Sequence, residues 1–80
     1  MQKALITTSQ IRAARALIRW SATDLASKSG VGVSTIKRLE VMHGVPTINI
    51  STMVAIQASL ELAGIEFIGS PDNSPGVRLK

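Results

Sequence analysis

The feature that most constrains this chain is the spacing of small and apolar residues between positions 25 and 39. Ala26 precedes Gly30 by four positions, and Val31 follows directly. Two short helices that cross closely need a small residue at the crossing, a turn residue that tolerates a positive φ, and a small apolar side chain between them. The complete pattern consists of Leu25, Ala26, Gly30, Val31, Ile36 and Leu39. This spacing predicts a helix-turn-helix over residues 22–42.

Capping signals place four helices along the chain. Thr7 and Gln10 have the spacing of a capping box, in which each side chain bonds the other residue's backbone N–H. Ser21 and Asp24 repeat that spacing, and the acid also suits the positive end of the helix dipole. The competing caps are Thr8 at the first helix, Gly32 or Ser34 at the third, and Asn49 or Ser51 at the fourth. The predicted helices cover residues 8–20, 22–29, 33–42 and 49–63, after an arm or extended lead over residues 1–7.

The fourth predicted helix is apolar on more than one face. One stripe at helical spacing contains Ile50, Met53, Ile56, Leu60 and Ala63. A second apolar region contains Val54, Ala55, Ala58 and Leu62. A helix of this kind needs more than one neighbour, so we expect the stripe to face the core. The second region is either more core or a dimer contact.

The tail changes character after Gly64, which is expected to end the fourth helix. Residues 65–68 and 77–80 are typical of two short strands, and residues 69–76 have the composition of a loop. An antiparallel hairpin follows, and a hairpin must pack on the helices or pair with another chain. The tail is therefore a candidate dimerisation element, because an exposed strand edge readily pairs with its twin.

Length and composition limit the class of protein. A chain of 80 residues suits one domain, 1–80, with a helical core over 8–63 and strands over 64–80. The predicted fold is mainly α: a small four-helix domain with a short C-terminal β-hairpin or strand pair. There is no cysteine, and no apolar run reaches the length of a signal peptide or of a membrane span, about 20 residues. We therefore expect a cytoplasmic protein with no membrane partner.

Charge favours a polyanionic partner. The net charge is +4 and the sequence pI is about 10.4, a balance for which nucleic acid is the commonest partner. One histidine, five acids and no cysteine leave few catalytic arrangements, and no glycine-rich phosphate loop follows a strand. We expect neither an enzyme nor a protein that needs a cofactor or metal.

The stretch QIRAARALIRWSATDLASKSGVGVSTIKRLE, residues 10–40, resembles the Cro/C1-type (XRE-like) helix-turn-helix family of phage and bacterial repressors. The resemblance extends to residue 63. The pair GIEF at 64–67 and GVRL at 76–79 is similar to the tail of short members. The resemblance implies a lambda-repressor-like fold, sequence-specific binding of double-stranded DNA and two-fold homodimers. It also implies association with the nucleoid and a bacterial or phage origin.

The family's site residues can be carried over by position. The resemblance implies that Val33, Ser34 and Arg38 face base edges, and that Lys37 meets a phosphate or a flanking base. A guanidinium can bind guanine through two hydrogen bonds, and such a pair contributes about 1–3 kcal/mol of discrimination. The residues expected to touch DNA are Ser21, Thr23, Val33, Ser34, Thr35, Lys37, Arg38 and His43. Arg15 and Glu40 match a structural ion pair of the family.

The chain departs from the family's pattern in two ways. Ala22 stands where a glutamine often contacts the DNA backbone, so Ser21 or Thr23 must replace that contact. Backbone N–H groups at the start of the second helix can also bind a phosphate. The predicted strands replace the family's usual fifth helix.

Simpler interpretations stand beside these roles. Lys37 and Arg38 can form an ordinary solvated face, and Val33 can simply pack. Trp20 is expected in the core, between the first two helices. His43 is a lone histidine in a loop, where the alternatives are a solvated side chain and a phosphate contact.

Three functions remain open on the sequence. The preferred one is a homodimeric transcriptional regulator, such as a repressor, on an inverted-repeat operator. An antitoxin that represses its own operon uses the same interface, and a gene for a small toxin next to it would indicate that role. A protein-interaction module would dock through the fourth helix and the tail.

Overall fold

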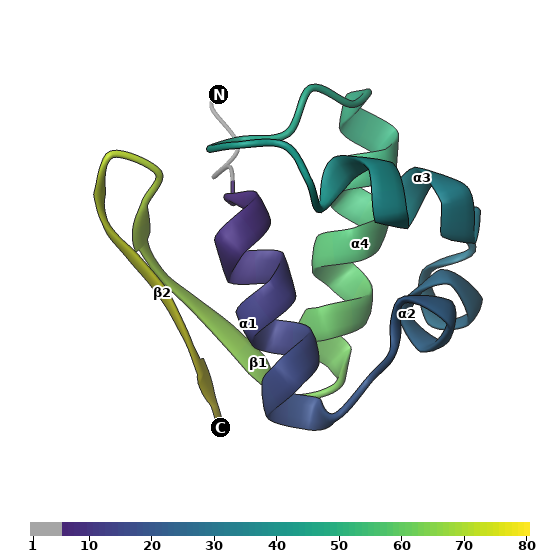
Figure 1. Cartoon of the computed structure of the whole chain (residues 1–80). Helices are drawn as coiled ribbons and strands as arrows, with labels where there is room; N and C mark the ends of the chain where they lie inside the picture. Colours follow the sequence, from purple (N-terminus) through teal and green to yellow (C-terminus); the bar gives the residue numbers. More distant parts are fainter. Residues whose placement is uncertain (1–5) are drawn as a thin grey trace.

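The computed structural model describes residues 6–80, in which four helices precede a two-stranded antiparallel sheet (Figure 1). The elements are α1 (Thr8–Ile18), α2 (Ala22–Ser29), α3 (Val33–Leu39), α4 (Ile50–Leu62), β1 (Ile65–Ser70) and β2 (Asn73–Leu79). The predicted mainly α fold with a C-terminal hairpin is confirmed. Of the predicted N-terminal lead, Ile6 is buried and Thr7 caps α1, so its end belongs to the domain. The remainder lies outside the described residues.

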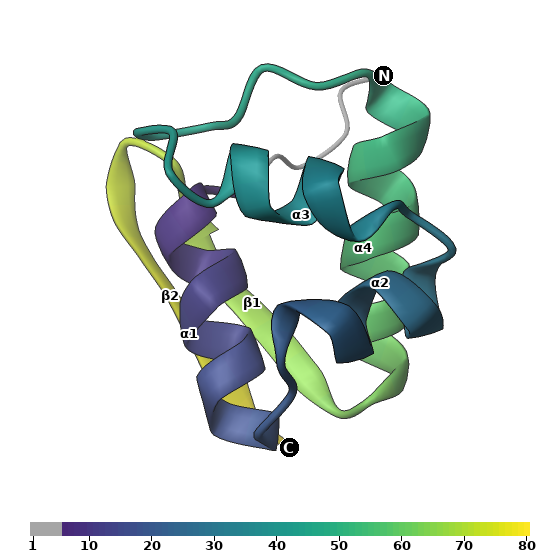
Figure 2. The same cartoon turned by 45° about the vertical axis from the view of Figure 1, so that its right-hand side comes forward.

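The core lies between α1, the helix-turn-helix and α4. Figures 1 and 2 agree in placing the hairpin against α1, on the side away from α2 and α3. Every helix and β1 supply side chains to one buried cluster of Ile6, Ile11, Ala14, Leu25, Ile36, Leu39, Met53, Ile56, Leu60 and Ile65. Trp20 and Val31 pack against this cluster and stay partly exposed.

Both predicted capping boxes are present. The Thr7 hydroxyl accepts the Gln10 N–H at 3.1 Å, and the Gln10 side chain accepts the Thr7 N–H at 2.9 Å. α1 ends at Ile18, slightly earlier than predicted, because Arg19 takes the left-handed conformation with a φ of 59°. Gly30 ends α2 in the same conformation, with a φ of 77°. This is the role that the spacing predicted for it.

α3 is shorter than predicted. The helix ends at Leu39 rather than near Met42, and Glu40 is its C-cap. The carbonyl groups beyond that point have partners elsewhere in the molecule. The Thr8 hydroxyl donates to the Met42 carbonyl at 2.9 Å, and the Thr8 N–H donates to the Gly44 carbonyl at 2.9 Å. Gly32 is the N-cap, without a side-chain hydrogen bond.

α4 begins at Ile50, and Asn49 is its N-cap. The Asn49 side chain accepts the Thr52 N–H at 2.9 Å, which selects Asn49 over Ser51. Met53, Ile56 and Leu60 are buried as predicted. Ile50 was expected in the same stripe, but it is the first residue of α4 and 57% of it is exposed.

The hairpin is longer than predicted. Strand pairing runs from Ile65 opposite Leu79 to Ser70 opposite Asn73, with an irregularity between Ile68 and Ser70. The predicted loop over 69–76 is therefore wrong, and only residues 71–72 join the strands. The end of a hairpin beyond its packed part needs no apolar side chains, so composition could not reveal it. Gly69 has a φ of 76° at the irregularity, a conformation typical of a glycine bulge.

One buried amide attaches the hairpin to α1. The Gln10 side chain, 4% exposed, donates to the Ile68 carbonyl at 3.2 Å and to the Gly76 carbonyl at 2.8 Å. These carbonyls belong to residues that face each other across the two strands. Gln10 thus caps α1 with its oxygen and binds both strands with its nitrogen.

Candidate nucleic-acid interface

The candidate interface is built on α2, the turn at Gly30 and α3. Leu25, Ile36 and Leu39 are fully buried, and they fix the inner sides of both helices. Because α3 has only two turns, burying Ile36 and Leu39 determines which of its side chains face outward. Packing against the core therefore sets the direction in which the candidate recognition helix presents its polar side chains.

The outer face of α3 carries the residues expected at base edges. Ser34, Lys37 and Arg38 are exposed, and Val33 is 37% exposed. Thr35 is partly buried, so it lies at the margin of this face. The face has two cations and no acid. Within residues 6–80 the structure records ion pairs for Arg15 and Arg78 alone, which leaves Lys37 and Arg38 without an intramolecular counter-charge.

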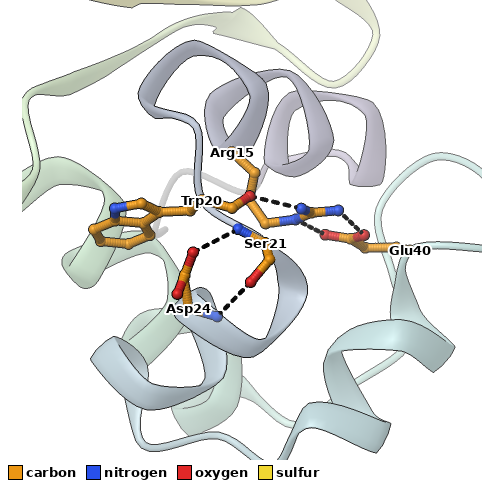
Figure 3. Close-up of polar contacts among 5 residues, drawn as sticks. All are labelled: Arg15, Trp20, Ser21, Asp24 and Glu40. Atoms are coloured by element: carbon orange, nitrogen blue, oxygen red, sulfur yellow. Dashed lines mark hydrogen bonds and ion pairs between the residues drawn. The ribbon is translucent and has the colours of Figure 1, made fainter.

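Arg15 on α1 holds the end of α3. Its guanidinium donates from Nε to Glu40 Oε2 at 2.7 Å and from Nη2 to Glu40 Oε1 at 2.6 Å (Figure 3). A third donor, Nη1, binds the Trp20 carbonyl at 2.8 Å. The hydrogen bonds and charge of Glu40 raise the pKa of Arg15, against the opposing effect of burial. One side chain thus joins α1, the α1–α2 connection and the residue that follows α3.

The start of α2 offers both donors and a negative charge. Ser21 Oγ accepts the Asp24 N–H at 3.0 Å, and Asp24 Oδ2 accepts the Ser21 N–H at 2.9 Å (Figure 3). The backbone N–H groups of Ala22 and Thr23 lie in the first helical turn, where no helical carbonyl can accept them. Ser21 and Thr23 are exposed, as a phosphate contact requires. The Asp24 carboxylate lies beside them and opposes an incoming phosphate.

The predicted site residues fall into three groups. Val33, Ser34, Lys37 and Arg38 lie on one face of α3, with Thr35 at its margin. Ser21 and Thr23 lie at the start of α2. His43 is exposed in the loop after α3, the loop whose Met42 and Gly44 carbonyls bind Thr8.

Residues 6–80 contain no group of three or more histidine, cysteine or acidic side chains placed to hold a metal ion. Among the same residues, no helix has the length and apolar character needed to cross a membrane.

Comparison with known protein families identifies the family to which the helical part of the chain belongs. The family model HTH_3, described as helix-turn-helix, matches residues 11–61, which run from the first turn of α1 to the last turn of α4. The chain belongs to this family. Its members are DNA-binding regulators of the Cro/C1 type, as the resemblance of residues 10–63 indicated. No curated protein matches the chain in sequence.

The positioning role of Thr8 in this helix-turn-helix protein was missed by sequence reasoning. Thr8 was predicted only as a competing cap, yet its hydroxyl and N–H bind the loop after α3. The partners are more than thirty positions away in sequence, at a separation of 34 residues for the hydroxyl bond. No local pattern reports a contact of this kind. Thr8 is nevertheless 1% exposed, and a polar residue buried at a helix start needs such a partner.

Proposed function

We propose that this chain is a sequence-specific regulator of transcription that inserts α3 into the major groove of duplex DNA. The observation that carries the proposal is the outer face of α3, where Lys37 and Arg38 are exposed while Glu40, the acid that follows α3, is bound by Arg15. A helix of this size fits the major groove, and cations there meet both phosphates and guanine.

The side chains of α3 divide into base and phosphate contacts. Arg38 donates two hydrogen bonds to guanine, Ser34 bonds a base edge or a phosphate, and Val33 contacts a thymine methyl group. Thr35, at the margin of the face, contacts the sugar–phosphate backbone. Lys37 contributes as a point charge beside a phosphate, which adds affinity without sequence preference.

The start of α2 and the loop after α3 bind the flanking backbone. The N–H groups of Ala22 and Thr23, with the hydroxyl groups of Ser21 and Thr23, form a donor set for one phosphate. Asp24 weakens this contact because its carboxylate lies in the same turn. His43 supplies a further donor to the phosphate chain.

The active form in this proposal is a homodimer on an inverted repeat. Two copies related by a two-fold axis place their α3 helices in successive major grooves, about 34 Å apart. The hairpin supplies the dimer contact, because a sheet of two strands leaves both strand edges without a partner. Binding of such a dimer across a promoter blocks polymerase, so we propose repression.

Selection of bound sites from random duplex DNA tests this function. The full chain is used at two salt concentrations, and recovered sequences are read for two-fold symmetry. A symmetric motif with half-sites one helical turn apart is the expected result. Weak, salt-sensitive binding without any motif contradicts the proposal, because only the backbone charge interaction then remains.

A second candidate function is docking on another protein. It is favoured by the apolar side chains that α4 exposes: Ile50 at 57%, Val54 at 40% and Leu62 at 90%. Reversing the charges of Lys37 and Arg38 to glutamate separates the two functions. DNA binding is abolished in that variant if α3 reads the groove. Docking through α4 or the hairpin is unchanged.

A further inference from the structure

A hollow lies on the surface where the connection after α1 meets the ends of α2 and α4. It has a volume of about 260 Å³ and is lined by Trp20, Lys28, Ser59, Leu62 and Ala63. None of these residues is among those assigned to DNA contact. The hollow is therefore separate from the proposed DNA-binding surface.

The walls of the hollow are mainly apolar. Leu62 is 90% exposed at the C-terminal end of α4, the highest exposure of any large apolar residue in the described chain. Trp20 is partly buried, and Figure 3 shows its indole turned away from the Arg15–Glu40 pair. A large apolar side chain in water next to a concave surface marks a candidate ligand site. Binding there is favourable because it removes apolar area from water.

The polar groups of the hollow match an anion. Lys28 Nζ lies 6.0 Å from the centroid of the Trp20 ring, at the outer limit of a cation–π contact. Among residues 6–80 no acid forms an ion pair with Lys28, and no acceptor is recorded for the Trp20 indole N–H. The residues that line the hollow thus supply one ammonium group and one indole N–H beside the apolar side chains.

We propose that this hollow binds a small amphipathic carboxylate. The apolar tail lies between the Trp20 indole and Leu62. The carboxylate pairs with the Lys28 ammonium group and accepts a hydrogen bond from the indole N–H. The volume is just below the range of roughly 300–1,000 Å³ that suits drug-sized ligands, so a smaller molecule fits. The proposal does not depend on DNA binding, since no group on α3 takes part.

Tryptophan fluorescence tests the proposal directly, because Trp20 is the single tryptophan of the chain. The full chain is titrated with 3-phenylpropionate as the probe. The matched alcohol, 3-phenylpropanol, carries the same tail without the charge, and acetate carries the charge without the tail. We expect a saturable change with the carboxylate, and binding about tenfold weaker with the alcohol, the loss expected for one charged hydrogen bond.

Variants identify the groups responsible. Lys28→Gln removes the proposed counter-charge and is expected to weaken 3-phenylpropionate about tenfold, whereas Lys28→Arg keeps the charge and the binding. Leu62→Ser removes the apolar wall and also weakens it. Lys37→Gln on α3 is the matched control, since it removes one exposed lysine charge from a residue that does not line the hollow. Circular dichroism confirms that each variant is folded.

Three results would overturn the proposal. The first is the lack of a saturable signal with 3-phenylpropionate. The second is equal affinity for the carboxylate and the alcohol, or an equal loss in Lys28→Gln and Lys37→Gln. The third is a dimer, seen by sedimentation, that Leu62→Ser dissociates, because Leu62 would then be covered by a second copy of the chain.

Discussion

Two ion pairs in this chain have similar distances and very different surroundings. Arg15 and Glu40 meet at 2.6 Å, with side chains 20% and 10% exposed. Arg78 and Glu66 meet at 2.7 Å on the outer face of the hairpin, with side chains 66% and 40% exposed. Water screens the second pair and competes for its hydrogen bonds, whereas the first pair is largely removed from water. Equal geometry therefore does not imply equal contributions to stability.

Removing either partner of the Arg15–Glu40 pair should lower the free energy of unfolding by about 2 kcal/mol, because the remaining group loses its hydrogen bonds in a partly buried place. Arg15→Ala should cost more than Glu40→Ala, since the Trp20 carbonyl also loses its donor. Urea unfolding of both single variants and the double variant measures the coupling. The matched control is Glu66→Ala, which should cost less than about 0.5 kcal/mol. Equal costs at both pairs would contradict the argument from burial.

The arginine side of this pair adds no pH dependence in the ordinary range. Glu40 raises the pKa of Arg15 in the folded state. A raised pKa gives stability that is complete below the pKa of the unfolded chain and is lost only as pH rises through the folded value. Arginine has both values far above neutral pH. The charge of Arg15 therefore does not limit its hold on the end of α3 near neutral pH.

Asp24 stabilises the start of α2 as part of its capping box, but its negative charge opposes the binding of a phosphate there. Asp24→Asn keeps an oxygen that can accept the Ser21 N–H but removes the charge from the first turn of α2. We expect the variant to bind duplex DNA about twofold more tightly per half-site at low salt, and the gain to shrink as salt screens the charge. Fluorescence anisotropy at two salt concentrations measures it. Unchanged affinity at low salt would place the phosphate away from α2.

Among the helices and strands, those with local signals were predicted well. The starts of α1 and α2 follow from capping boxes, in which each residue meets a partner three positions away. The end of α3 and the length of the hairpin depend on distant groups instead. Thr8 binds the carbonyls after α3, and Gln10 binds both strands of the hairpin. Sequence periodicity contains no record of such contacts, so those boundaries were wrong.

The hairpin depends on glycine at one position and not at another. A Cβ at Gly69 would overlap the Ser74 carbonyl oxygen, and its φ of 76° is unfavourable for other residues. Gly69→Ala should therefore cost about 2 kcal/mol or more of unfolding free energy. Gly76 has no atom within 4 Å of a Cβ, so Gly76→Ala in the facing strand is the control, with an effect within about 0.5 kcal/mol. Thermal unfolding of both variants decides, and similar losses would refute the steric explanation.

For the molecule as a whole, the hairpin has two roles: it covers one side of the hydrophobic core, and it is the candidate dimer contact. Ile65 is buried, and Phe67 and Val77 pack against the core cluster. Ending the chain at Gly64 would uncover α1 and remove both partners of the Gln10 amide, so truncation would test folding rather than dimerisation.

The sequence identified the exposed face of α3 from spacing and resemblance. It could not show the hollow beside Trp20, which three separate segments form together.

The salt dependence of DNA binding shows how many phosphate contacts a variant loses, and therefore how many protomers bind the operator. Lys37 is proposed to meet a phosphate, and each lost phosphate contact reduces the slope of log K against log salt by about 0.9. A homodimer loses two contacts at once, so Lys37→Gln should reduce the slope by about 1.8, whereas a monomer would lose about 0.9. Binding should weaken equally on all sequences.

Arg38→Gln is the informative counterpart on the same face of α3. If Arg38 reads guanine, the variant should lose about 1–3 kcal/mol per half-site on the selected operator and much less on unrelated duplex DNA. Both variants are titrated on both DNAs across a series of salt concentrations. Loss of affinity for all sequences alike in Arg38→Gln would make Arg38 a second phosphate contact. Sequence preference would then have to come from Ser34, Val33 or the shape of the DNA.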